Sequence, residues 1–185
     1  MSGFRVRPDQ EVWLTLPGGF PWNDFTDDLT WAAEVAQDRA AQDAPVAVRT
    51  AIAENALALV RADPPLPGVQ ERFWWLPSIG RAAVVAHVTA VELDDSLRAE
   101  PLESFAQVGV GGLVQTIRAV EGSAFDEAID CMLVIPLGEE SIALRRQIGR
   151  RVGTLVLLDV FVEDGLALYD AEQDVSALFA SVQLR

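Results

Sequence analysis

The chain holds few side chains that could do catalytic or ligand chemistry. Among its 185 residues there is one histidine, His87, and one cysteine, Cys131, and all 14 basic residues are arginines. One histidine and one cysteine cannot supply the three or four nitrogen and sulfur ligands of a typical zinc site. Without lysine, the chain has neither a phosphate-binding Walker lysine nor a Schiff-base lysine. We therefore expect no metal site and no cofactor.

His87 and Cys131 both lie in apolar runs that predict β-strands. A histidine in such a strand is more often a hydrogen-bonded core residue than a catalytic one. Cys131 alternates with Ile129 and Leu133, which predicts a core-facing row, and apolar surroundings raise the pKa of a thiol. We therefore predict that the protein is not an enzyme. A small hydrolase that uses Cys131 and His87 is one alternative.

The acidic residues are the second group that could do chemistry, and they give the chain a net charge of −14. They gather at predicted strand ends as Asp94-Asp95, as Glu139-Glu140, and as a third group of Asp126, Glu127 and Asp130. Neighbouring residues of a strand face opposite sides of the sheet, so each pair offers one carboxylate to any site. A solvated rim is the favoured interpretation. The acidity disfavours nucleic acid as a partner and supports a second alternative, an immunity-type inhibitor of a cationic toxin.

Four arginines form the one basic cluster of the chain. Arg145, Arg146, Arg150 and Arg151 lie within a segment, residues 142–151, that contains no acid. Ion pairing with acids on a neighbouring strand, such as the third acidic group, is the interpretation that the strand pattern favours. The alternative is a patch that recognises an anion or docks a partner.

Tryptophans supply further candidate contacts with a partner. We expect most of the five tryptophans to pack in the core. Any that are exposed are candidates for a partner-binding groove, because aromatic residues are enriched at interfaces. The candidate partner-binding residues are therefore Trp22, Trp74 and Trp75, together with the four clustered arginines.

Hydrophobic periodicity predicts the elements that would position these residues. A short strand over Glu11–Leu16 precedes a helix from about Asp24 to Gln42 and a second helix, capped by Asp43, that ends at Asp63. A period of two then predicts strands at about 71–76, 82–93, 113–121, 125–135, 142–150 and 153–163. A short helix over Leu102–Val108 and a last helix capped by Asp170 complete the pattern.

This order of elements predicts an α+β fold. Two of the strands are apolar on both faces, so both faces of their sheet should be covered. We expect one domain over residues 1–185, with a predominantly antiparallel sheet of about six to seven strands and helices packed on its faces. No apolar run reaches the ~20 residues of a membrane span, and residues 1–10 lack the apolar core of a signal peptide. We therefore predict a cytoplasmic protein.

The carboxyl-terminal half carries motifs that resemble a known superfamily. They are Val134-Ile135-Pro136-Leu137-Gly138, Ile142-Ala143-Leu144-Arg145-Arg146, the run Leu155 to Val162, and Asp174 to Val182. Together they resemble the PsbP-like and DcrB-like superfamily, including its actinobacterial members of unknown function. The resemblance implies an antiparallel sheet sandwiched by helices and mostly non-enzymatic roles, such as adaptors, assembly factors and chaperones. It brings no catalytic residues with it.

The function that these features favour is a non-catalytic, cytoplasmic protein-binding module, an adaptor or a chaperone. The expectation depends on the missing catalytic constellation and on the superfamily resemblance. We expect another protein as the partner, with a homodimer as a further possibility, and neither nucleic acid nor a membrane as a target.

Overall fold

The computed structural model describes residues 3–78, 84–162 and 165–184. The chain forms two compact units, one of Thr15–Pro65 and one of Met1–Leu14 with Leu66–Arg185. The single domain over residues 1–185 that the sequence predicts stays a prediction. Within the described residues, no helix is both long enough and apolar enough to span a bilayer.

The smaller unit contains two helices, α1 (Asp28–Arg39) and α2 (Val46–Arg61). Helix α1 begins later than the expected Asp24, because the side chain of Asp27 accepts a hydrogen bond from the Thr30 N–H and so caps the helix. The predicted cap Asp43 is wrong, since Pro45 precedes α2 and no side chain caps it. An ion pair of 2.6 Å between Arg61 and Asp28 links the two helices.

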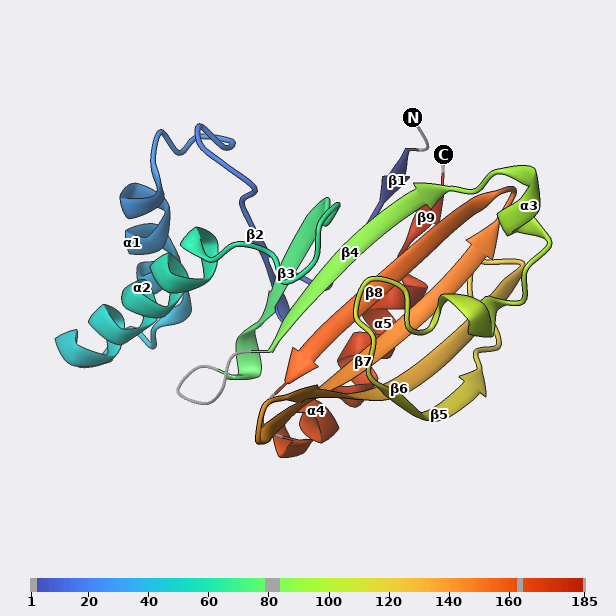
Figure 1. The fold of residues 1–185 in the computed structure, drawn as a ribbon. Helices are drawn as coiled ribbons and strands as arrows, with labels where there is room; N and C mark the ends of the chain where they lie inside the picture. Colours follow the sequence, from blue (N-terminus) through green and yellow to red (C-terminus); the bar gives the residue numbers. More distant parts are fainter. Residues whose placement is uncertain (1–2, 79–83, 163–164, 185) are drawn as a thin grey trace. The chain divides into compact units, whose positions relative to one another are not determined.

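The main sheet has seven antiparallel strands in the order β2-β3-β4-β8-β7-β6-β5, all in the larger unit except the last two residues of β2 (Figure 1). The strands are β2 (Trp13–Leu16), β3 (Glu71–Trp75), β4 (Val85–Glu92), β5 (Leu113–Ala119), β6 (Glu127–Leu137), β7 (Glu140–Arg151) and β8 (Thr154–Val162). Two further short strands, β1 (Phe4–Arg5) and β9 (Gln183–Leu184), pair with each other. The α+β class and the antiparallel sheet predicted from the sequence are confirmed. Residues 82 and 83 of the predicted strand 82–93 lie outside the described residues.

The long strands β7 and β8 are joined by a two-residue turn. Val152 and Gly153 both have positive φ angles, 49° and 78°. A hairpin turn of this kind matches the right-handed twist of its strands, and glycine adopts the conformation without a steric cost. The turn fixes the register that pairs Arg146 of β7 with Asp159 of β8.

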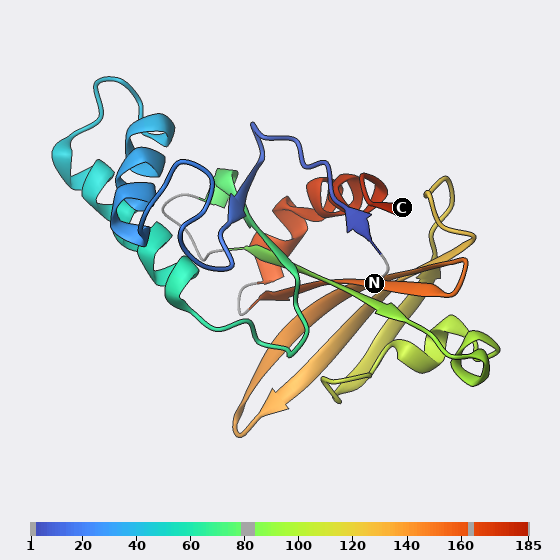
Figure 2. The same ribbon diagram turned by 90° about the horizontal axis from the view of Figure 1, so that it is seen from above.

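One face of the sheet, called here the helix face, is covered by α4 (Gly165–Asp170) and α5 (Glu172–Ala180). Figures 1 and 2 show both helices on the same side of the strands. The predicted cap at Asp170 is wrong, because that residue ends α4, a helix that sequence reasoning missed, and Ala171 precedes α5. Val175, Leu178 and Phe179 of α5 are buried in the core of this face.

The opposite face, called here the loop face, is covered by a segment between β4 and β5. This segment contains α3 (Asp95–Arg98) and the 3-10 helix η2 (Leu102–Phe105), where the sequence predicted a short helix over Leu102–Val108. A second short 3-10 helix, η1 (Leu76–Ser78), follows β3. Leu102 and Phe105 pack on Cys131, Leu133 and neighbouring residues in a second apolar core. The sheet therefore has an apolar layer on both faces, as the apolar strands predicted.

Candidate functional site

The clustered arginines are divided between the two faces because neighbouring residues of β7 point to opposite sides. Arg145 lies on the helix face and Arg146 on the loop face. Both side chains are buried, with 6% and 0% of their surfaces exposed. The cluster in the sequence is therefore not one continuous basic patch in space.

Arg146 forms a closed ion pair with Asp159 of β8. Its Nε and Nη2 donate to the two carboxylate oxygens at 2.6 and 2.8 Å. Its Nη1 donates to the carbonyl oxygens of Phe105, Ala106 and Val108, and the shortest of these hydrogen bonds is the one to Val108, at 2.7 Å. Burial raises the pKa of Asp159, and the hydrogen bonds from Arg146 oppose that rise. This arginine fastens the covering segment to the sheet.

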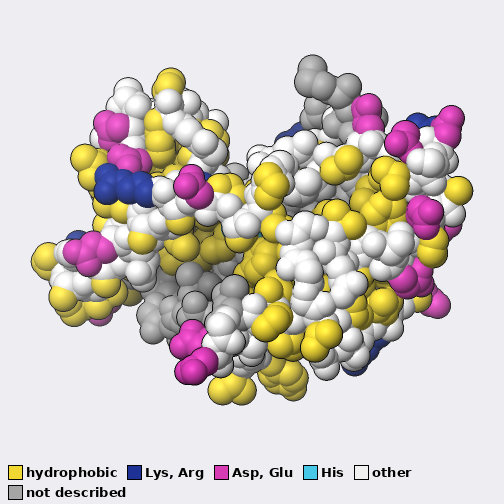
Figure 3. Space-filling view, viewed as in Figure 1, with side chains coloured by type: hydrophobic (Ala, Val, Ile, Leu, Met, Phe, Trp, Pro, Cys, Tyr) yellow, Lys and Arg dark blue, Asp and Glu magenta, His cyan; other side chains and the backbone are white. Residues whose placement is uncertain are grey.

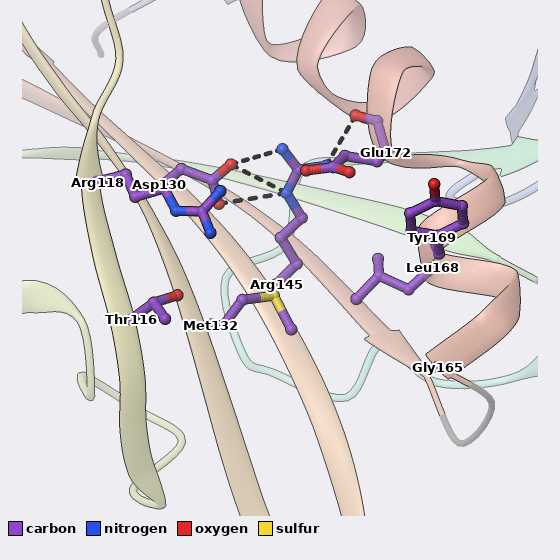
Figure 4. A pocket seen from close by; sticks show the side chains of 9 residues that line it. All are labelled: Thr116, Arg118, Asp130, Met132, Arg145, Gly165, Leu168, Tyr169 and Glu172. Carbon is purple, nitrogen blue, oxygen red and sulfur yellow. Dashed lines mark hydrogen bonds and ion pairs between the residues drawn. The ribbon is translucent and has the colours of Figure 1, made fainter.

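Arg145 forms the corresponding pair on the helix face. Its Nε and Nη2 donate to the carboxylate of Asp130 on β6, with the shortest contact at 2.5 Å. Its Nη1 donates to the Glu172 carbonyl oxygen and its Nη2 to the Ser176 hydroxyl, both at 2.8 Å and both on α5 (Figure 4). The expected pairing of an arginine with an acid on the neighbouring strand is confirmed for this residue.

Arg150 and Arg151 also donate within the molecule. Arg150 pairs with Glu127 at 2.6 Å and donates to the carbonyl oxygens of Arg98 and Glu100. Arg151 donates to the Ala124 carbonyl oxygen. All four clustered arginines therefore hold strands and loops together, and their role in binding a partner stays a prediction.

His87 and Cys131 lie on one transverse row of the loop face. Strand pairing places Arg72, His87, Asp159, Arg146 and Cys131 opposite one another across five successive strands. Three strand spacings separate His87 from Cys131, about 14 Å at ~4.8 Å per spacing. A histidine at that distance cannot take the proton of the thiol directly.

Burial shifts both titratable groups away from a nucleophile and base pair. The pKa of His87 falls to about 4, because burial and the nearby Arg72 disfavour the charged ring. The pKa of Cys131 rises to about 11, because of burial and then the charge of Asp130. The Nδ1 atom of His87 is buried and has no hydrogen-bond partner within the part of the chain that the structure describes. The geometry therefore gives no support to a Cys131–His87 hydrolase.

The acidic groups are dispersed. Asp94 caps α3 by accepting from Ser96 and Leu97, and these hydrogen bonds keep its pKa low. Asp95 pairs with Arg98, while Glu139 and Glu140 are exposed at the β6–β7 hairpin. Among residues 3–78, 84–162 and 165–184, no three histidine, cysteine or acidic side chains are grouped so that they could hold a metal ion.

The three candidate tryptophans differ in exposure. Trp74 and Trp75 are buried, and the Trp75 Nε1 donates to Asp174 of α5 at 2.8 Å. Trp22 is half-buried in the smaller unit, where it stacks on Phe25. Trp74 and Trp75 therefore belong to the core, and of the three only Trp22 presents part of its ring.

A cavity of about 200 Å³ opens on the helix face beside Arg145 (Figure 4). It lies between β5, β6 and β7 on one side and α4 and α5 on the other. Its lining residues are Thr116, Arg118, Asp130, Met132, Arg145, Gly165, Leu168, Tyr169 and Glu172. Sequence reasoning identified Arg145 here, but it missed Arg118 on β5 and the side chains of α4. Exposed Tyr169, the chain's one tyrosine, was the available signal.

The edge strand β5 is the second candidate feature. All seven of its residues are exposed, including Leu113, Val114 and Ile117. Within residues 3–78, 84–162 and 165–184, β6 is the one strand that pairs with it, and no other described strand covers the far side of its backbone. The period of two predicted this strand, but the sequence did not indicate that it would lie at the edge of the sheet.

The architecture is an α+β fold with a seven-stranded antiparallel sheet between a helical layer and a loop layer. Several solved structures are similar to it, including the three that follow. CyanoP, the PsbP protein of Synechocystis sp. PCC 6803, is 10% identical, with a TM-score of 0.49 over 67% of this chain and 79% of CyanoP. CyanoP carries the name of the superfamily that the sequence motifs resemble.

LpqN of Mycobacterium tuberculosis, described as involved in cell envelope biogenesis, is 9% identical, with a TM-score of 0.45 over 100% of this chain and 84% of LpqN. A Pseudomonas aeruginosa protein of unknown function, described as a putative regulator, is 12% identical, with a TM-score of 0.39 over 68% and 78% of the two chains. These likenesses concern the fold alone. No protein-family model and no curated protein matches the sequence.

Proposed function

We propose that this protein is a non-catalytic protein-binding module, an adaptor or a chaperone, that holds an extended segment of another protein against strand β5. The observation that carries the proposal is the complete exposure of β5 at the edge of the sheet. An exposed edge strand is a template on which an extended peptide can pair, and several peptide-binding domains work by such strand addition.

The side chains of β5 support this role. The pairing of β5 with β6 shifts register between Val114 and Thr116. As a result, Val114 lies opposite Leu133 and Ile117 opposite Cys131, so both face the loop side of the sheet. Hydrophobic side chains are exposed at this edge, toward the lower right in Figure 3. An added strand would cover these two aliphatic residues and gain apolar contact as well as backbone hydrogen bonds.

The charge of the molecule favours a basic partner. The chain carries a net charge of −14. A hollow of about 340 Å³ at the end of β5 is lined by Glu103 and Glu127 together with apolar residues. Glu103 makes no ion pair within the described residues, whereas Glu127 pairs with Arg150. A partner segment that combines aliphatic residues with an arginine or lysine would complement this end of the strand.

Short peptides selected from a random library against the full chain would test the proposal. We expect the selected peptides to be extended, to slow amide hydrogen exchange in β5, and to bind Ile117→Asp at least about tenfold more weakly. Val48→Asp is a matched control, because Val48 is 42% exposed and Ile117 is 39% exposed. Peptides that bind both variants as tightly as the wild type would contradict the proposal.

The immunity-type inhibitor is the second candidate, because the same acidic balance would suit a protein that masks a cationic toxin. It differs from the first in requiring a dispersed acidic surface rather than one strand. A charge-reversal scan that changes exposed acids outside the β5 edge separates the two. Weaker binding of the cationic toxin by these charge-reversed variants would support the inhibitor. Unchanged affinity for the toxin would argue against it.

A further inference from the structure

The cavity on the helix face is lined by two unpaired charges of opposite sign. Arg118 projects from β5 and Glu172 comes from the first turn of α5. Both residues are exposed, and within the described residues neither side chain makes a hydrogen bond or an ion pair. Figure 4 shows Arg118 on the Asp130 side of the Arg145–Asp130 pair and Glu172 on its Arg145 side, as the pairing of Arg118 with Asp130 across β5 and β6 requires. Two opposite charges that share a cavity without pairing can each attract one charged group of a zwitterionic ligand.

The Arg145–Asp130 pair does not add a net charge to this cavity. Two nitrogens of Arg145 donate to the Asp130 carboxylate, and its remaining contacts are with the Glu172 carbonyl oxygen and the Ser176 hydroxyl. The guanidinium is therefore committed to the protein, and its main effect on the cavity is to hold β6, β7 and α5 in place. Arg118 is left to bind an anion, and Glu172 is left to bind a cation.

The rest of the lining is apolar or carries hydroxyl groups. Met132 and Leu168 line it, and Tyr169, 74% exposed, stands on the side of α4. Thr116 lies next to Arg118 in the pattern of β5 residues that face this side. The volume of about 200 Å³ is below the ~300–1,000 Å³ of typical drug-sized pockets. The cavity therefore suits a small molecule that carries two opposite charges close together and an apolar side chain.

From this arrangement we infer that the cavity binds a free amino acid with an apolar side chain. The carboxylate of the ligand pairs with Arg118, whose planar guanidinium matches a carboxylate in two parallel hydrogen bonds. The ammonium group pairs with Glu172, and the side chain contacts Met132, Leu168 and Tyr169. The inference depends on the cavity and not on the partner proposed for the edge of β5.

Titration calorimetry with L-leucine and two matched analogues tests the charge requirement. Isoamylamine lacks the carboxylate of leucine, and 4-methylpentanoate lacks its ammonium group. We expect leucine to bind at least about tenfold more tightly than either analogue, because each analogue leaves one of the two charges unanswered. An analogue that binds as tightly as leucine would overturn the inference, as would the failure of every apolar amino acid to bind at about 10 mM.

Two variants locate the binding site. Arg118→Gln should weaken leucine at least about tenfold while leaving isoamylamine unchanged, and Glu172→Gln should weaken leucine while leaving 4-methylpentanoate unchanged. Arg7→Gln and Glu54→Gln are matched controls, since both residues are exposed and lie outside the cavity lining. If both cavity variants bind leucine as tightly as the wild type does, leucine binds at another site and the inference is wrong. The Ile117→Asp variant should bind leucine normally, which separates this test from that of the proposed function.

Discussion

Arg145 and Arg146 are neighbours on one strand, yet their ion pairs differ in how far solvent reaches the acidic partner. On the loop face, both Arg146 and Asp159 are almost completely shielded from solvent, and three backbone carbonyls accept the remaining donor. On the helix face, Asp130 keeps 21% of its side-chain surface exposed, and the pair borders an open cavity. Identical residue types thus give a closed structural contact on one side and the wall of a cavity on the other.

The covering layer, and not the arginine, makes this difference. The segment that contains η2 supplies carbonyl oxygens that satisfy the Arg146 guanidinium, so no solvent is needed there. Helices α4 and α5 leave a gap beside Arg145, which keeps the carboxylate of Asp130 in contact with water. Breaking a fully buried pair leaves an uncompensated charge, whereas water can solvate the remaining member of a half-exposed pair. The two pairs should therefore respond very differently to the same substitution.

Arg146→Met should give the largest loss of stability, about 3–5 kcal/mol, because it leaves Asp159 buried without a partner. The free energy of unfolding, measured by denaturant titration, tests this value. The double variant Arg146→Met with Asp159→Leu should recover part of the loss. Arg118→Met removes an arginine whose side chain makes no hydrogen bond or ion pair with the described residues; it is the control and should change stability by less than about 0.5 kcal/mol. If Arg146→Met loses as little stability as the Arg118→Met control, the Arg146–Asp159 pair is not closed to solvent.

His87 lies on the same row as Arg146, and it should make stability depend on pH. The unfolded chain takes up a proton at the ordinary pKa of histidine, about 6.5, whereas the native ring does so only at about 4. The free energy of unfolding should therefore fall as the pH drops through this window, by up to about 3 kcal/mol. Subtracting the profile of His87→Gln isolates this contribution from those of the carboxylates. Parallel profiles for the two proteins would mean that the ring is not shielded.

Arg145→Met should have the smallest effect of the three, about 1–3 kcal/mol, because solvent can reach Asp130. The Glu172 carbonyl and the Ser176 hydroxyl also lose a donor, so part of the cost should appear as faster amide exchange in α5. Hydrogen exchange followed residue by residue measures this local loosening. A loss equal to that of Arg146→Met would remove the contrast between the two faces.

Much of the sheet could be predicted from the sequence because alternating apolar residues report strands directly. The stretch near residues 71–76 and the strands around Cys131 and Asp159 were found from this period alone. The pattern also favoured pairing of the arginine cluster with the acidic group on the neighbouring strand, and the structure shows which residues pair, Arg145 with Asp130 and Arg150 with Glu127. Asp159 was available as a signal, since it is the one charged residue in the run from Leu155 to Val162, but it was not recognised as the partner of Arg146.

The cavity could not be predicted, because it depends on where two short helices stop. Asp170 was expected to cap the last helix, but the chain forms the extra turn α4 before it, and that turn brings Leu168 and Tyr169 to the cavity. The edge position of β5 depends on the order of strands in the sheet, which the period of a single strand does not report. Buried Trp74 and Trp75 show the same limit, since neighbouring aromatic residues can both be covered when both faces of a sheet are.

The pairing of β1 with β9 places Phe4 opposite Leu184, two residues that are far apart in the sequence. A short linker between these two strands could therefore close the segment from β1 to β9 into a covalent ring. Because a ring has fewer unfolded conformations than an open chain, closure would raise the unfolding temperature while every native contact stayed the same. We therefore expect the fold to tolerate a change of chain topology from linear to circular.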